Sequence, residues 1–167
     1  MERTGISTHR APYCAIALLL AIVQIAARAG DLASGSELSG SDFGGSSRGL
    51  SAQISQTGER NEAVMNQQGT FHSGQVAQIG SGNEVSTAQR GEDNQFALRQ
   101  SGIGNALELT QAGRANQACI AQTGDGNHAL VTQYGNSNQV SVQQGALSPS
   151  LTIQQHGNGL AARVIQY

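Results

Sequence analysis

The side chains with the clearest chemistry in this sequence are amides at a fixed spacing. A glutamine recurs every 11 residues without interruption, at Gln56, Gln67, Gln78, Gln89, Gln100, Gln111, Gln122, Gln133, Gln144, Gln155 and Gln166. An asparagine follows most of them by five residues, at Asn61, Asn83, Asn94, Asn105, Asn116, Asn127 and Asn138. A primary amide both donates and accepts hydrogen bonds, so identical amides stacked above one another can form a continuous ladder.

Two further columns keep the same phase. Glycine lies two residues after the glutamine, at Gly58, Gly69, Gly80, Gly91, Gly102, Gly113, Gly124, Gly135 and Gly157, and Ala146 is the exception. An apolar residue lies two before it, at Ile54, Met65, Val76, Leu98, Leu109, Ile120, Val131, Val142, Ile153 and Val164, and Thr87 breaks this column. Four columns in phase define eleven units at a spacing of 11 residues over positions 51–167, the last of them represented by residues 161–167.

The pattern within one unit alternates in the manner of a β-strand. In residues 106–116, Leu107, Leu109 and Gln111 share one face of an extended chain, and Glu108 and Thr110 share the other. We therefore predict a strand of about six residues per unit, because apolar residues that alternate in this way are typical of half-buried strands. Gly-x-x-Asn then forms the turn, since both residues tolerate left-handed backbone. A helical coil of the same period is disfavoured by glycine and asparagine in nearly every unit.

Units of this kind must stack to bury their apolar faces. We predict an all-β fold, a two-sheet β-solenoid of the cross-β type, whose 22-residue rungs each contain two 11-residue units in the order strand-arc-strand-arc. Residues 22 apart then stack about 4.8 Å apart, and the two inward apolar columns form a thin dry core. The glutamines share the inward face, where buried amides need hydrogen-bond partners.

The ends of such a stack are its weak point. An end rung leaves unpaired backbone groups and half-satisfied amides. No capping segment is recognisable next to the repeats, so we expect subunits to stack end to end into a filament. Most charges fall on arcs or outward positions, and Glu92 and Arg114 are expected to attract each other one rung apart.

The N-terminal part differs from the repeats. Residues 1–29 have the basic start, the apolar run and the small-x-small site, Ala27-Arg28-Ala29, of a secretory signal peptide. Residues 30–50 are rich in Gly and Ser and are predicted to be a flexible segment. Removal of the signal takes Cys14 away, so Cys119 remains as the single cysteine and no internal disulfide is expected. No span of a membrane is expected after signal cleavage.

Composition argues against several function classes. The chain has 9 basic and 11 acidic residues and no basic cluster, which disfavours nucleic-acid binding. Two cysteines and four scattered histidines show no metal-ligand spacing, and no cofactor site is recognisable. His72, His128 and His156 are expected to be plain surface residues without partners, so we predict no enzyme activity. The alternative is a monomeric secreted solenoid that binds a surface such as ice or polysaccharide, for which Thr110 and Thr132 offer only a short outward column.

Seven units carry the full motif Gln-x-Gly-x-x-Asn. They are QTGERN (56–61), QIGSGN (78–83), QRGEDN (89–94), QSGIGN (100–105), QAGRAN (111–116), QTGDGN (122–127) and QYGNSN (133–138). This motif, after a signal peptide and a Gly/Ser-rich segment, resembles the curlin repeat of curli fibre subunits, and the likeness extends over residues 51–167 as curlin half-repeats of 11 residues.

The resemblance implies an extracellular functional amyloid of the biofilm matrix, which polymerises with itself and with other curlin subunits. Such subunits are exported unfolded through the periplasm and a dedicated outer-membrane channel of a Gram-negative bacterium, with accessory proteins. Residues 30–50 would then address the chain to that channel. The family has a major fibre subunit and a minor, nucleator subunit. The late departures at Ala146, Pro149 and Leu160, and Arg163 in a degenerate last unit, favour the minor type slightly, whereas the final Gln-Tyr resembles the major type.

Overall fold

The computed structural model describes residues 49–146 and 150–167, which form eleven β-strands and no helix. The signal segment 1–29, almost all of segment 30–50, and Pro149 lie outside the described residues, so the division of the chain into these parts stays a prediction. The strands are β1 (Ser51–Glu59), β2 (Glu62–Thr70), β3 (Ser73–Ser81), β4 (Glu84–Glu92), β5 (Gln95–Ile103), β6 (Ala106–Arg114), β7 (Gln117–Thr123), β8 (His128–Asn136), β9 (Gln139–Gln144), β10 (Leu151–His156) and β11 (Ala161–Gln166).

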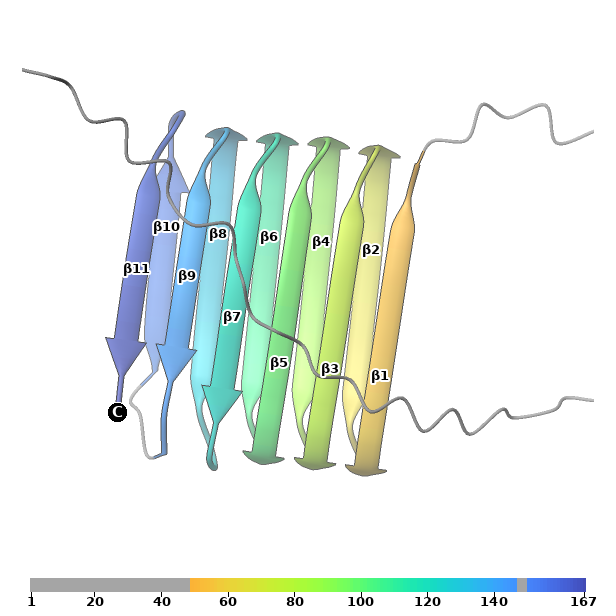
Figure 1. Cartoon of the computed structure of the whole chain (residues 1–167), viewed down its shortest axis with the longest axis vertical. Helices are drawn as coiled ribbons and strands as arrows, with labels where there is room; N and C mark the ends of the chain where they lie inside the picture. Colours follow the sequence, from red (N-terminus) through yellow and green to blue (C-terminus); the bar gives the residue numbers. More distant parts are fainter. Residues whose placement is uncertain (1–48, 147–149) are drawn as a thin grey trace, which may run out of the picture. The chain divides into compact units, whose positions relative to one another are not determined.

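Alternate strands belong to two facing parallel sheets (Figure 1). One sheet has the order β1-β3-β5-β7-β9-β11, and the other has the order β10-β8-β6-β4-β2. Each strand pairs with the strand 22 residues away, as Ile54 does with Val76 and Leu109 with Val131. The predicted two-sheet β-solenoid with 22-residue rungs is therefore confirmed.

The strands are longer than the sequence indicated. Seven of the strands have nine residues, and only β9, β10 and β11 have the expected six. The extra residues follow the glutamine, because the glycine column still pairs in register, as Gly58 does with Gly80. The turn is correspondingly shorter than the predicted Gly-x-x-Asn segment.

The glycine column is held by steric contact between rungs. Gly102 has a φ of 125°, and a Cβ atom there would lie 2.0 Å from the carbonyl oxygen of Gly124 in the next rung. The left-handed backbone recurs two residues later, at Gly104 among others, where a Cβ would meet no atom within 4 Å. Non-glycine residues therefore also occupy this second position, among them Asp93, Ala115 and Ser137, all with positive φ.

The core is a thin layer between the sheets. Its fully buried members come from the inward face of both sheets and include Leu98, Leu109, Ile120, Val131 and Val142. Thr87 takes an apolar place in this layer, and its hydroxyl donates a 3.3 Å hydrogen bond to the carbonyl of Val64.

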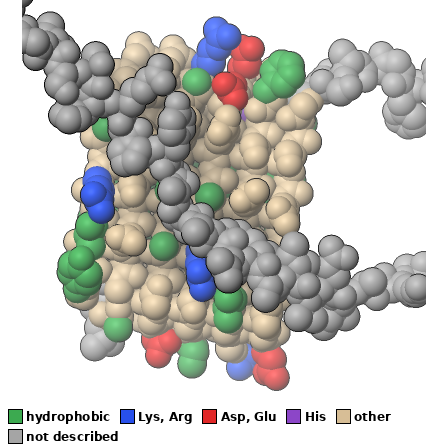
Figure 2. Space-filling view, viewed as in Figure 1, with side chains coloured by type: hydrophobic (Ala, Val, Ile, Leu, Met, Phe, Trp, Pro, Cys, Tyr) green, Lys and Arg blue, Asp and Glu red, His purple; other side chains and the backbone are tan. Residues whose placement is uncertain are grey.

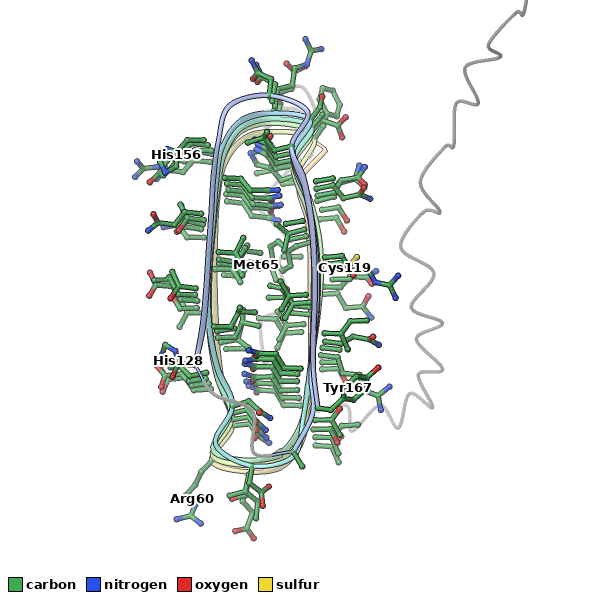
Figure 3. The ribbon with its side chains drawn as sticks, turned by 90° about the vertical axis from the view of Figure 1, so that its left-hand side faces the viewer. Arg60, Met65, Cys119, His128, His156 and Tyr167 are labelled. Atoms are coloured by element: carbon green, nitrogen blue, oxygen red, sulfur yellow. The ribbon has the colours of Figure 1, made fainter. Side chains whose placement is uncertain are left out.

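Gly74 has no side chain in the core, and side chains from neighbouring strands occupy the space beside it. A Cβ on Gly74 would lie 2.5 Å from the Phe96 ring and 2.8 Å from the Met65 sulfur. Gly74 thus makes room for the largest core side chain, Phe96. Figure 3 shows Met65 inside the solenoid and Cys119 on its outside.

Cys119 bears on the expectation of no internal disulfide, which stays a prediction for the chain after signal removal. It lies on the outward side of β7, only 9% exposed, and its sulfur is disulfide-bonded. The expectation concerned the chain after signal removal, and Cys14, the second cysteine of the sequence, lies outside the described residues.

Candidate functional site

Two glutamine ladders run along the inside of the solenoid. In the six-stranded sheet the Nε2 of Gln56, Gln78, Gln100, Gln122 and Gln144 donates to the Oε1 of the glutamine 22 residues later, at 2.7–3.0 Å. The five-stranded sheet repeats this from Gln67 to Gln155 at 2.8–2.9 Å. All of these bonds run in the same direction, so each ladder has an acceptor end at the N-terminal strand and a donor end at the C-terminal strand.

The same amides also tie the two sheets together. Gln78 on β3 donates a second bond, 2.9 Å long, to the carbonyl of Glu62 on β2. Gln111 on β6 does the same to the carbonyl of Gln95 on β5, at 3.1 Å. Both hydrogens of these amides are therefore used, one along the stack and one across it. Because the amides are fully buried, removing one would leave several polar atoms without partners.

Two asparagine ladders line the arcs. Asn105 donates from its backbone N–H and from Nδ2 to the Oδ1 of Asn83, at 3.2 and 2.9 Å. Its Nδ2 also donates to the carbonyl of Gly124, at 2.8 Å. Asn116 bonds in the same way to Asn94 and to Gly135. The side-chain ladder donates toward the N-terminal edge, opposite to the direction of the glutamines.

His72 takes the place of an asparagine and is not the surface residue that the sequence indicated. It is fully buried, and its Nδ1 accepts a 3.2 Å bond from the backbone N–H of Asn94. Its Nε2 lies 3.0 Å from the carbonyl of Gln68. A neutral ring with its hydrogen on Nε2 satisfies both contacts, as Oδ1 and Nδ2 do in an asparagine. The signal was present in the sequence, because His72 lies five residues after Gln67.

The other two histidines lie on the outside of the five-stranded sheet (Figure 3). His128 and His156 are both exposed. The His156 ring does have a neighbour, because its centroid lies 5.1 Å from that of Tyr134 on the adjacent strand. The described residues contain no group of three or more His, Cys, Asp or Glu that could hold a metal ion.

One ladder is broken near its C-terminal end. Asn127 Oδ1 is buried without a hydrogen-bond partner, the one such side-chain atom among the described residues. In the other rungs this oxygen accepts from the residue 22 positions later; by sequence spacing that residue is Pro149, which lies outside the described residues. Proline has no N–H and no side-chain amide, so it cannot donate. The equivalent break in the other column, at Leu160, is milder because the Leu160 backbone N–H still donates to Asn138 Oδ1, at 3.0 Å.

The solenoid has two uncovered edges. At the N-terminal edge Ile54, assigned to the core by the sequence, is 44% exposed, and Gln56 is also exposed, because no described strand covers β1. At the C-terminal edge Val164 and Gln166 on β11 are half-buried. Gln166 accepts from Gln144, but none of the described glutamines accepts from Gln166. The inward columns therefore end in surfaces of the same composition as the interior.

On the face seen in Figure 2, most of the side chains over the strands are uncharged, with a few basic side chains among them. In Figure 2 the acidic side chains gather at the upper and lower margins of the visible face, beyond the strands. The predicted attraction between Glu92 and Arg114 is present as an exposed ion pair with a 3.4 Å separation. The part of the chain that the structure describes has no helix suited to crossing a membrane.

A comparison with protein families gives a match in the second half of the repeat region. Residues 113–145, from the end of β6 to the arc after β9, match the family described as curlin associated repeat. A comparison with curated proteins finds no match. The matched segment contains three successive 11-residue periods of the glutamine column, and it supports the resemblance to curlin. Over residues 113–145 the chain is therefore similar to the curlin associated repeat.

Proposed function

We propose that the chain is a structural subunit of extracellular curli-like amyloid fibres, which grow by end-to-end stacking of solenoids. The observation that carries this proposal is the pair of uncovered edges, where Ile54 and Gln56 at one end and Val164 and Gln166 at the other repeat the residue types of the buried interior. A second copy on either edge would bury these apolar side chains and extend both glutamine ladders.

Stacking of a second copy on an edge strand is favoured over an edge that stays exposed to solvent. An open parallel sheet presents a row of unpaired backbone N–H and C=O groups and acts as a template for another strand. Stacking in register adds an amide ladder and a dry interface to those backbone bonds. Because the repeat is nearly the same in every rung, the contacts of a docked copy are those already present between neighbouring strands.

The location and route follow from the resemblance. We propose that residues 1–29 direct the chain to the periplasm and that residues 30–50 address it to an outer-membrane export channel. On the cell surface the fibre would serve adhesion and the biofilm matrix, with other curlin subunits as partners. The role is structural rather than enzymatic, as in the curlin family.

We further propose a minor, nucleator-like role. The repeats deteriorate toward the C-terminus, where Ala146, Pro149 and Leu160 replace the turn residues and Asn127 Oδ1 lacks a partner. A nucleator would shorten the lag phase of a major-type curlin subunit when added in small proportion. An unchanged lag at all proportions would contradict this role and leave the fibre-forming proposal standing.

The fibre-forming proposal can be tested on residues 30–167, purified in denaturant and diluted without seeds. We expect thioflavin-T fluorescence to rise and the product to give a meridional reflection near about 4.8 Å, the strand spacing of a cross-β fibre. A β-rich monomer that shows no rise in thioflavin-T fluorescence over days would contradict the proposal and favour the surface-binding solenoid.

Two matched variants on β1 separate edge stacking from general aggregation. Ile54→Lys places a charge on the inward side of the edge strand, where stacking would bury it, and should lengthen the lag at least tenfold. Gln53→Lys adds the same charge one residue away, on the outward side, and should leave the lag within about twofold. Equal effects of the two variants would mean that fibre growth does not use this edge.

A further inference from the structure

The edge strands of the two sheets are offset from each other along the stacking axis, and because the number of units is odd, the first and last strands lie in the same sheet. Because successive units alternate between sheets, β1 and β11 both belong to the six-stranded sheet, whereas β2 and β10 end the five-stranded sheet. Each unit advances by half a strand spacing, so the strands of the rear sheet lie between those of the front sheet (Figure 1). The edge strands of the two sheets are therefore offset by half a spacing at both ends.

A second copy can continue this stack in two ways. Without rotation, β1 of the next copy lies on β11, and its β2 then lies two spacings from β10. One strand is missing from the five-stranded sheet at every junction. With a half-turn about the stacking axis, β1 of the next copy lies on β10 and its β2 lies on β11. Both sheets then continue at the ordinary spacing, and no gap is left.

We propose that copies of this chain stack head to tail with a half-turn between successive subunits, an inference that rests on the proposed fibre-forming function. An even number of units would need no such rotation. The half-turn places the six-stranded sheet of one copy in line with the five-stranded sheet of the next. Each side of the fibre then alternates between the outer face that carries Cys119 and the outer face that carries His128 and His156.

The direction of the glutamine ladders sets the polarity. Every described bond between two glutamine side chains donates toward the C-terminal edge, so that edge offers Nε2 donors and the N-terminal edge offers Oε1 acceptors. In the half-turn arrangement Gln155 donates to Gln56 of the next copy, and Gln166 donates to Gln67 of the next copy. Head-to-head contact would instead set acceptors against acceptors.

The inward faces of the joined strands also match. Strand β10 presents Leu151, Ile153 and Gln155, and β1 presents Ala52, Ile54 and Gln56. Strands β11 and β2 likewise both present a small residue, an apolar residue and a glutamine. The two sheets are thus interchangeable at the junction, as a half-turn requires.

Gly157 at the C-terminal edge keeps room for the next copy. Within the solenoid a Cβ on Gly80 would lie 2.0 Å from the Gly102 carbonyl oxygen, because the backbone of the next rung passes there. At Gly157 a Cβ would meet only the Leu160 side chain, at 3.5 Å. The half-turn brings Gly58 of the next copy over this position, in the same register as the interior glycines.

Helical reconstruction of fibres of residues 30–167 by cryo-electron microscopy tests the inference. A half-turn junction predicts a rise of about 26 Å per subunit, which is 5.5 strand spacings, with a rotation near 180° apart from gradual sheet twist. The unrotated junction predicts about 29 Å, or six spacings, with no half-turn and one missing strand per subunit. Fibres with that second symmetry would overturn the inference while upholding the proposed function, and failure to form fibres would overturn both.

A ten-unit variant provides the matched control. Deletion of residues 106–116 removes one complete unit and makes the number of strands even. Its fibres should have a rise of about 24 Å and no half-turn. A half-turn that persists in the variant would show that the unit count does not set the rotation and would contradict the inference. Should the variant not assemble, the symmetry of the unaltered fibre still decides.

Discussion

The middle rungs and the edge rungs of this solenoid are built from the same residue types in different surroundings. Ile120 on β7 is fully buried, whereas Ile54, its equivalent on β1, is 44% exposed. Gln100 is fully buried between two other glutamines, whereas Gln56 is exposed and bonds to one. Neighbouring strands, rather than residue type, therefore determine burial here.

This difference explains how one repeat can serve both folding and assembly. A column residue in the middle is satisfied by its own chain, and the same residue at an edge is left with half of its contacts. The same substitution should therefore act on subunit stability in the middle and on fibre growth at an edge. Each prediction below compares one such pair.

The largest difference is expected for the glycine column. Gly102→Ala would place a Cβ 2.0 Å from the Gly124 carbonyl oxygen, so we expect loss of the folded state by circular dichroism. Gly157→Ala has a similarly positive φ, but its Cβ would make only an ordinary 3.5 Å contact with the Leu160 side chain, so it should cost only the strain of about 1–3 kcal/mol in the monomer. The second variant should nevertheless stop growth at the C-terminal edge. Equal destabilisation of the monomer by Gly102→Ala and Gly157→Ala would contradict the claim that the backbone of the next rung excludes a side chain from the glycine column.

Truncation of the apolar column should have the next largest effect. Ile120→Ala leaves a cavity in the closed core and should cost about 2–5 kcal/mol in urea unfolding of the monomer. Ile54→Ala should cost well under half as much, since a large part of that side chain is already in water. The edge variant should instead slow fibre elongation. A reversed order of stabilities would mean that β1 is covered in the monomer.

The glutamine ladder should respond in the same way with smaller values. Gln100→Ala removes the acceptor of Gln78 and the donor to Gln122, and each unpaired buried group costs about 1–3 kcal/mol. Gln56→Ala affects one half-exposed bond and should change unfolding by less than about 1 kcal/mol. Urea titrations of the two variants, monitored under non-assembling conditions, measure the difference. Similar losses of unfolding free energy in the two variants would show that a buried ladder bond stabilises the monomer no more than a ladder bond at the edge.

The smallest effect is a gain in stability. Pro149→Asn would supply a backbone N–H and an amide to Asn127 Oδ1, and it should stabilise the monomer by about 0.5–1.5 kcal/mol. Pro149→Ala restores the N–H alone and is the matched control, with an intermediate gain. No gain from either variant would mean that the lone oxygen is satisfied by water in solution.

Much of this fold was predictable because the period is strict. Four columns at a spacing of 11 indicate strands that stack every 22 residues, and the pairing of Ile54 with Val76 follows directly. The strand length was not predictable from alternation alone, because the glycine after the glutamine has no side chain to reveal its face. Only the stacked structure shows that this glycine pairs in register with the next rung.

The sequence was least informative where one residue type stands in for another. His72 was expected on the surface because it differs from asparagine, yet its two ring nitrogens reproduce an acceptor and a donor in the same column. Ala115 has a left-handed backbone that its residue type does not indicate. The arc requires this backbone conformation, and the open space found at equivalent positions leaves room for the alanine Cβ. Column position was a better guide than residue chemistry in both cases.

The central claim is that assembly gives the edge strands the environment of the middle strands. Hydrogen–deuterium exchange, read by mass spectrometry on monomer and fibre of residues 30–167, measures this for each segment. We predict that residues 51–59 and 151–166 exchange rapidly in the monomer and become as protected in the fibre as residues 95–123. Edge segments that still exchange rapidly in mature fibres, while the middle segment is protected, would contradict end-to-end stacking.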